Sequence, residues 1–273
     1  MSSVPAITSY HPKIRVEHDG HVTTVTIDAP EAKNACTGSM WVAIGRIFAD
    51  LAYSGTRAVV LTGSGGDFCA GADLSGGGEA PLPRPPEARA SMVDGMRVLA
   101  EVVLAVHQCP VPVVAKVDGV CVGAGLGLAL AADLTWCSDR ARLSAIFAKR
   151  GLSLDFGTSW LLRERLGVHR AKELAFTAKQ LSGTEAADIG LVNAVVPAAG
   201  LDAAVAELVA TIVAGPPLAL AMMKRELDNA SSTSLAAALE TEALAQGVNV
   251  TTEDLREALT AYAERRPPVF KGR

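Results

Sequence analysis

In the first two-thirds of the chain, apolar residues follow two patterns. Some segments have the every-second-residue alternation of strands, and others have the spacing of three to four residues that is typical of helices. Residues 14–29 predict a β-hairpin, because β-branched residues dominate VTTVTI and Asp19-Gly20 is a tight-turn dipeptide. Apolar residues recur at helical spacing over 41–51, which predicts an amphipathic helix that stops before Gly55. A short apolar strand follows at 59–61. Paired strands followed by a helix predict an α/β fold.

After residue 198 the pattern is purely helical. The predicted helices cover 201–214, 216–229, 234–246 and 252–265. We therefore divide the chain into a mixed core, residues 1–198, and a C-terminal helical region, residues 199–273. Helices with an apolar face and little β-structure to cover are expected to pack on other subunits.

The stretch from Cys109 to Cys137 offers a candidate site. Its residues 112–117 predict a short strand, and a glycine-alternating loop, Gly123 to Gly127, opens a predicted helix. Amides at a helix start have no intrahelical partner and carry the positive end of the helix dipole. They can therefore hold an anion, or an oxyanion that exists only during a reaction.

Another glycine-bearing loop comes earlier in the chain, in VVLTGSGGDFCAGADLSGG from Val59 to Gly77, and also follows a strand. In chain order, this is the first glycine-bearing loop and Gly123 to Gly127 is the second. Two such loops can face one small negative charge from two sides. Residues 76–86, GGGEAPLPRPP, lack periodicity and follow directly. They predict a surface loop that is either a lid over the site or a tolerated insertion.

Composition narrows the possible partners and the compartment. The net charge of -4 gives no reason to expect nucleic acid or an anionic membrane as a partner. The five cysteines form no CxxC pair, and neither they nor the five histidines have the spacing of a metal site. Scattered cysteines are typical of reduced thiols, and MSSVPAITSY has no signal-peptide core, so we expect a cytoplasmic protein.

Several segments resemble the crotonase family, the enoyl-CoA hydratases and isomerases. They are DAPEAKNA (28–35), FCAGADL (68–74), PVVAKVDGVCVGAG (112–125) and the C-terminal RRPPVFKGR. The resemblance covers nearly the whole chain. It implies a spiral of ββα turns with a C-terminal helical trimerisation region, a homotrimer or dimer of trimers, and an acyl-CoA substrate. It implies no cofactor, since the CoA thioester is the substrate.

By position in these motifs, the resemblance implies an oxyanion hole formed by the backbone amides of Ala72 and Ala124. These would stabilise a thioester enolate. It also implies a set of residues that bind CoA or substrate: Ala32, Lys33, Ala70, Gly71, Asp73, Leu74, Gly123, Gly125, Phe270 and Lys271. Ala32 stands where the family has its usual lysine, one place before Lys33.

Two glutamates that activate water in the family's hydratases are absent here, where Gly127 and Phe147 occupy their positions. Asp155 falls where isomerase-type members carry their acid. A single carboxylate suits the transfer of one proton between two carbons, and apolar neighbours, Leu152, Leu154, Phe156 and Trp160, are expected to raise its pKa. The alternative is that Asp155 caps the helix that follows it.

The resemblance, with Asp155 as the remaining carboxylate, thus implies an enoyl-CoA double-bond isomerase with Asp155 as proton shuttle. A hydratase with a different acid stays open, as does a non-catalytic acyl-CoA-binding homologue that has lost its glutamates. A dinucleotide-binding oxidoreductase is disfavoured, because Leu128 stands where the glycine fingerprint needs its third glycine.

Overall fold

The computed structural model describes residues 10–51, 54–75 and 91–273, and within them the strands form two sheets. The larger sheet has the order β1-β2-β3-β4-β6-β9 and the smaller one β5-β7-β8. The strands are β1 (Ile14–Asp19), β2 (Val22–Ile27), β3 (Ala58–Gly63), β4 (Val113–Val117), β5 (Val120–Val122), β6 (Leu134–Ser138), β7 (Arg142–Ser144), β8 (Leu181–Ser182) and β9 (Ala194–Val196). From β2 to β9 the larger sheet is parallel.

The predicted N-terminal hairpin is confirmed. β1 and β2 pair antiparallel, from Ile14 opposite Ile27 to Asp19 opposite Val22. Gly20 has φ +56° in the turn, a conformation that glycine adopts without steric penalty.

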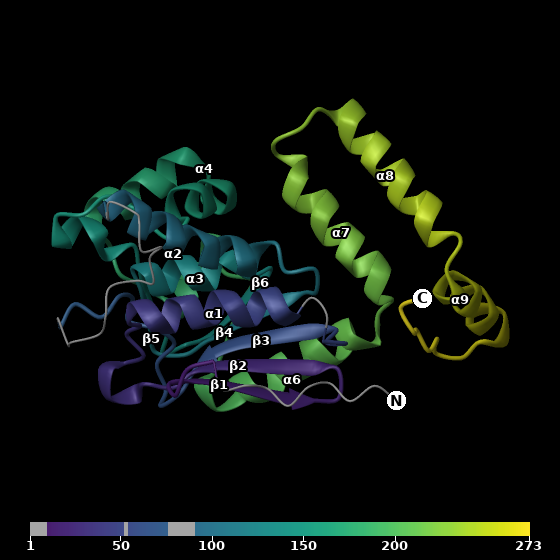
Figure 1. Ribbon diagram of the computed structural model, residues 1–273, viewed down its shortest axis with the longest axis horizontal. Helices are drawn as coiled ribbons and strands as arrows, with labels where there is room; N and C mark the ends of the chain where they lie inside the picture. The colour runs from purple at the N-terminus through teal and green to yellow at the C-terminus, as the bar shows by residue number, and fades with distance from the viewer. Residues whose placement is uncertain (1–9, 52–53, 76–90) are drawn as a thin grey trace.

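Helices cover both faces of the larger sheet (Figure 1). α1, α2 and α3 lie on one face and α6 on the other. The helices of the described residues are α1 (Gly38–Leu51), α2 (Met92–His107), α3 (Ala124–Ala131), α4 (Thr158–Thr177), α5 (Gly183–Asp188), α6 (Leu201–Ala214), α7 (Pro217–Ala230), α8 (Leu235–Asn249) and α9 (Glu253–Glu264). Alternate residues of a strand point to opposite faces of the sheet, so the side chains of β3 pack in two hydrophobic cores, one on each face. Val59 and Leu61 pack with α1, α2 and α3, whereas Val60 packs with α6.

The helical C-terminal region is confirmed, with each helix within three residues of its predicted bounds. α6 buries Leu201, Val205 and Val209 against the sheet, and Lys116 of β4 lies 2.5 Å from the Asp202 carboxylate. In contrast, α7 and α8 contain no buried residue and stand away from the core as a helical hairpin (Figure 1). The division at residue 198 stays a prediction, because α6 still belongs to the sheet.

Within the described ranges, no single helix is long and apolar enough to cross a membrane. Only the pair Ala198–Ala214 and Pro217–Ala230, bent by 107°, meets that criterion together.

Candidate active site

The first glycine-bearing loop follows β3 and is clamped by Asn34. The Asn34 side chain is fully buried and makes three hydrogen bonds. It accepts from the Ala29 amide at 2.9 Å and donates to the carbonyls of Ser64 and Asp67 at 2.8 and 2.7 Å. Asn34 therefore joins the N-terminal segment to the loop that leads to Ala72. Sequence reasoning missed this role, although Asn34 lies inside the motif at 28–35.

The backbone joins the same two segments. The Ala70 amide donates to Lys33 O at 3.0 Å, the Cys36 amide to Gly71 O at 2.8 Å, and the Asp73 amide to Cys36 O at 2.9 Å. Successive amides of an extended chain point in opposite directions. The Ala72 amide therefore points away from Cys36, and it has no hydrogen-bond acceptor among the described residues.

The second loop opens α3. Gly123 has φ +58°, which favours glycine, and Ala124 is the first residue of the helix. The Ala124 amide has no partner within the described part of the chain, as expected for the first turn of a helix. Ala124 is thus a donor that carries the positive end of the α3 dipole.

The structure brings these two loops into direct contact. Cys69 and Cys121 form a β-bridge, in which the Cys69 amide donates to Val120 O at 2.9 Å and the Val122 amide to Cys69 O at 3.1 Å. A Cβ on Gly125 would lie 2.3 Å from Cys69 O, so only glycine allows this approach. A Cβ on Gly71 would lie 3.4 Å from the Ala124 nitrogen. The two predicted oxyanion residues therefore lie in neighbouring loops that are fixed to each other.

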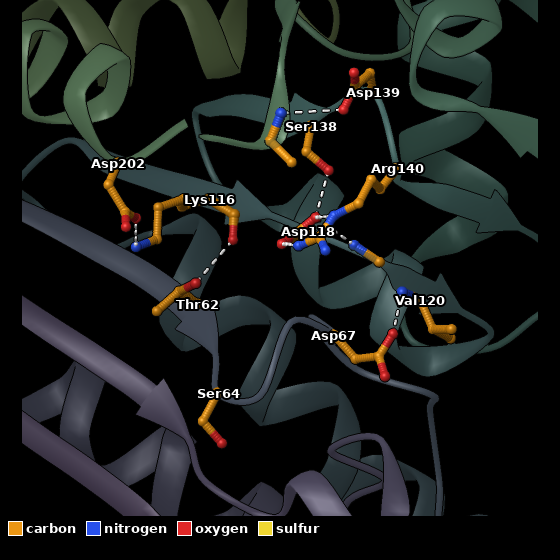
Figure 2. Close-up of polar contacts among 12 residues, drawn as sticks. Thr62, Ser64, Asp67, Lys116, Asp118, Val120, Ser138, Asp139, Arg140 and Asp202 are labelled. Carbon is orange, nitrogen blue, oxygen red and sulfur yellow. Dashed lines mark hydrogen bonds and ion pairs between the residues drawn. The ribbon is translucent and has the colours of Figure 1, made fainter. Parts of the chain in front are cut away.

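Polar side chains within and next to these loops make further hydrogen bonds (Figure 2). The Asp67 carboxylate accepts from the Val120 amide at 2.7 Å, which ties the first loop to β5. Asp118 accepts from the Ser138 hydroxyl at 2.5 Å, from the Gly119 amide at 2.9 Å and from the Arg140 guanidinium. Burial opposes ionisation of Asp118, but the hydrogen bonds from Arg140 and Ser138 outweigh it and lower its pKa. Sequence reasoning used Asp118-Gly119 only as a strand boundary.

Asp155 lies in the turn before α4, and its side chain does not cap that helix. α4 begins at Thr158, and its N-cap is Gly157, which makes no side-chain cap hydrogen bond. The Asp155 carbonyl, not its carboxylate, accepts from the amide and hydroxyl of Thr158 at 3.0 and 2.7 Å. The interpretation of Asp155 as a helix cap is therefore wrong for its side chain.

The Asp155 carboxyl is partly buried, and burial raises its pKa as expected. Its Oδ1 is buried without a hydrogen-bond partner in the described residues. Of the four predicted apolar neighbours, Leu152 is 55% and Trp160 is 44% exposed. Trp160 instead packs against His107. Phe156 is 5% exposed and is the buried apolar neighbour.

The Asp155 turn lies against α3, the helix that Ala124 opens. A Cβ on Gly127 would lie 2.3 Å from Phe156 O, so the backbone next to Asp155 fills the space beside Gly127. Phe147, at the second position of a missing glutamate, is apolar and buried. Asp155 thus precedes a residue that packs on α3 one turn along the helix from Ala124.

The other predicted binding residues divide into two groups. Lys33, Ala70, Gly71 and Asp73 lie together through the hydrogen bonds above, with Ala32 next to Lys33. The Ser75 amide donates to the Asp73 carboxylate at 2.9 Å, and hydrogen bonding with Ser75 lowers the Asp73 pKa, so Asp73 orders its loop. Leu74 is exposed. The expected lid, residues 76–86, lies outside the described residues.

Phe270 and Lys271 are not brought to this site within the chain. Arg57, just before β3, donates to Phe270 O at 2.9 Å, and the buried Asp254 accepts from the Lys271 amide at 2.6 Å. The loop with Ala72 follows the opposite end of β3, so the tail lies at the other end of the sheet (Figure 1). Among the described residues, no group of three or more His, Cys, Asp or Glu side chains is placed to hold a metal ion.

Comparisons with known proteins identify the family of the chain. Residues 17–273 match the family model described as enoyl-CoA hydratase/isomerase. A probable enoyl-CoA hydratase from Rhodobacter capsulatus is 36% identical, over 97% of this chain and 100% of the relative.

Solved structures agree as well. The crystal structure of a putative enoyl-CoA hydratase from Streptomyces coelicolor is 35% identical, with a TM-score of 0.90 over 100% of this chain and 98% of that one. A putative enoyl-CoA hydratase from Thermobifida fusca in complex with CoA is 34% identical, with a TM-score of 0.81 over 87% and 93%. The crotonase resemblance and the crotonase-like fold are confirmed, and the chain belongs to the enoyl-CoA hydratase/isomerase family of acyl-CoA enzymes.

Proposed function

We propose that this protein isomerises enoyl-CoA thioesters, with Asp155 as the proton carrier and the Ala72 and Ala124 amides as oxyanion donors. The state of the Asp155 carboxyl is the observation that supports this most. One of its oxygens is buried without a partner among the described residues, and burial raises its pKa. A carboxyl group in that state is suited to accept a proton and release it again.

In the proposed reaction, the thioester oxygen of a 3-enoyl-CoA accepts hydrogen bonds from Ala72 and Ala124. Ionised Asp155 removes a proton from carbon 2, and the electron pair moves into the thioester as an enolate. The two amides stabilise the negative oxygen, and the α3 dipole adds to the effect at Ala124. Asp155 then delivers the proton to carbon 4, which leaves a 2-enoyl-CoA. No atom is gained or lost, so no cofactor is required.

The same site favours isomerisation over hydration. Hydration needs groups that hold and activate a water molecule. Gly127 supplies no side chain, the Phe156 backbone fills the space beside it, and Phe147 is apolar and buried. The usual pair of water-activating carboxylates therefore has no equivalent at these positions.

We propose that CoA lies along the segments around Lys33 and Ala70, which hydrogen-bond to each other beside Ala72. The complex of the Thermobifida fusca relative with CoA supports a CoA thioester as the ligand. Phe270 and Lys271 lie at the other end of the sheet within one chain. We propose that they reach the CoA of a neighbouring subunit, in a homotrimer or a dimer of trimers.

The test is to incubate the pure protein separately with a 2-enoyl-CoA and a 3-enoyl-CoA, and to analyse products by chromatography and mass. The proposal predicts conversion of the 3-enoyl substrate without a change in mass. Asp155→Asn should lower that rate by about 10²–10⁴-fold, the usual contribution of a positioned general acid–base. Asp188→Asn, an exposed carboxylate on α5, is the control and should keep the wild-type rate.

Two other outcomes would contradict the proposal. Addition of one water to the 2-enoyl substrate, undiminished in Asp155→Asn, would indicate a hydratase with another acid. Inactivity on both substrates, together with measurable binding of a CoA thioester, would favour a non-catalytic acyl-CoA-binding protein.

A further inference from the structure

The turn that carries Asp155 has a strained backbone. Phe156 has φ +51° and Gly157 has φ +74°, so two successive residues adopt the left-handed conformation. This conformation is unfavourable for a bulky residue and persists only where the surroundings enforce it. What surrounds Phe156 therefore decides where Asp155 lies.

Three helices hold this turn. The Phe156 ring packs on Trp41 of α1, with ring centroids 4.5 Å apart. A Cβ on Gly157 would lie 3.0 Å from Val103 Cγ1 of α2. On the third side, a Cβ on Gly127 of α3 would lie 2.3 Å from Phe156 O and 2.9 Å from Phe156 Cβ.

The Gly127 contact leaves no alternative residue at that position. Neither the Phe156 carbonyl nor its Cβ can move without moving the backbone of the turn. Glycine is a poor helix former, so its place inside α3 has a packing reason. That reason is the close approach of the Asp155 turn.

The backbone also decides where the Asp155 carboxyl lies. The Asp155 carbonyl is fixed by Thr158, through the amide and the hydroxyl. The carboxylate Oδ1, in contrast, has no hydrogen bond to any described residue. Because no hydrogen bond from the described part of the chain holds that oxygen, the backbone conformation of the turn determines its position.

We propose that Gly127 and Phe156 are positioning residues, and that their contact sets the Asp155 carboxyl relative to Ala124, the first residue of the same helix. This inference rests on the proposed role of Asp155. It has a consequence for the choice of reaction. A side chain at 127 and the observed turn at 155–157 exclude each other, so this chain cannot carry a carboxylate at both positions.

The first test is Gly127→Ala, which should push the turn away from α3. Misplacement of a reacting group by about 1 Å costs on the order of 10²-fold in rate. We expect a loss of about that size in kcat on a 3-enoyl-CoA, with KM unchanged because the CoA-binding segments are not touched. Gly247→Ala in α8 is the matched control, because its Cβ meets nothing within 4 Å, and it should keep the wild-type kcat.

A pH–rate profile separates positioning from a general loss of structure. Burial alone raises the Asp155 pKa, and no charged neighbour contributes among the described residues. A displaced turn would expose the carboxyl to water and lower that pKa. The acidic limb of the profile should therefore move to lower pH in Gly127→Ala, and stay in place in Gly247→Ala.

Phe156→Leu keeps an apolar side chain but lacks the ring that contacts Trp41. This variant tests the positioning role if Gly127→Ala does not fold. We expect a smaller loss of kcat and a shift of the acidic limb in the same direction. Wild-type kcat and pH profile in the folded variants, with Asp155→Asn inactive, would overturn the positioning role alone. A fully active Asp155→Asn would overturn the proposed function, and this inference with it.

Discussion

At the residue scale, the proposed chemistry depends on two backbone amides, and most substitutions leave a backbone N–H in place. Substitution by proline can remove the N–H at Ala124, because Ala124 is the first residue of α3. Proline is tolerated at this helix position and has no N–H. Gly123 precedes it and lacks a Cβ, which relaxes the steric restriction before proline.

Ala124→Pro should therefore remove one oxyanion donor while α3 persists. Loss of one such donor lowers kcat by roughly 10²–10³-fold in other enzymes, and we expect a similar loss here. Steady-state kinetics with a 3-enoyl-CoA, together with circular dichroism of the folded variant, would measure it.

The control is Leu235→Pro, which places proline at the first residue of α8, where Leu235 is exposed. It should keep both helix content and rate. A folded Ala124→Pro that retains the wild-type kcat would show that the Ala124 amide receives no charge in the rate-limiting step.

At the element scale, the C-terminal tail depends on α9. The Glu257 carboxylate accepts from the Arg266 guanidinium at 2.6 Å and from the Val269 amide at 2.9 Å. These hydrogen bonds, with Arg266 first, lower the pKa of Glu257 from its ordinary 4.5 to about 2. Such a contact stabilises the folded tail fully above pH 4.5, and it is lost as the pH falls toward 2.

We therefore predict that the Glu257 carboxyl titrates near pH 2 in an NMR titration. Arg266→Gln should raise its midpoint toward 4.5, because the largest cause of the shift is removed. An ordinary midpoint in the wild type would mean that this contact does not persist in solution.

Much of the element order was predictable from sequence because periodicity is a local property. The hairpin needed only its β-branched run and Asp19-Gly20, and the C-terminal helices needed only their helical spacing. The smaller sheet was not predicted, since β5, β7 and β8 have at most three residues each. Such strands are too short to show a period.

The candidate site was predictable only in part. The glycines in the sequence predicted the two loops, and in the structure these loops contact each other. The clamp by Asn34 joins residues about thirty positions apart, and the contact of Gly127 with Phe156 spans a similar separation. The left-handed φ of Phe156 had no sequence signal, because only its packing against Trp41 and Gly127 explains it.

At the scale of the whole molecule, the helical hairpin of α7 and α8 presents large apolar side chains to solvent. Leu227 is 76% and Leu244 is 66% exposed, and Leu239 and Val248 are exposed as well. Contiguous exposed apolar surface marks an interaction site. This hairpin is the surface through which we expect the proposed trimer to form.

Leu244→Arg should therefore shift the protein from trimers toward monomers in light scattering, because a charge would be buried at the interface. Glu207→Arg, an exposed position on α6 outside this hairpin, is the control and should not. A wild-type protein that is monomeric at all concentrations would contradict the assembly, and with it the proposed reach of Phe270 and Lys271 to a neighbour.

The central claim is that Asp155 carries one proton between two carbons of an acyl-CoA. Incubation of a 3-enoyl-CoA in ²H₂O, with wild type and Asp155→Asn, tests it most directly by NMR of substrate and product. The account predicts that the wild type shifts the double bond with the proton from carbon 2 retained at carbon 4, and with deuterium entering only where the Asp155 proton exchanges with solvent before transfer, and that Asp155→Asn does not shift the double bond at a comparable rate. A double-bond shift at the wild-type rate in Asp155→Asn would contradict it.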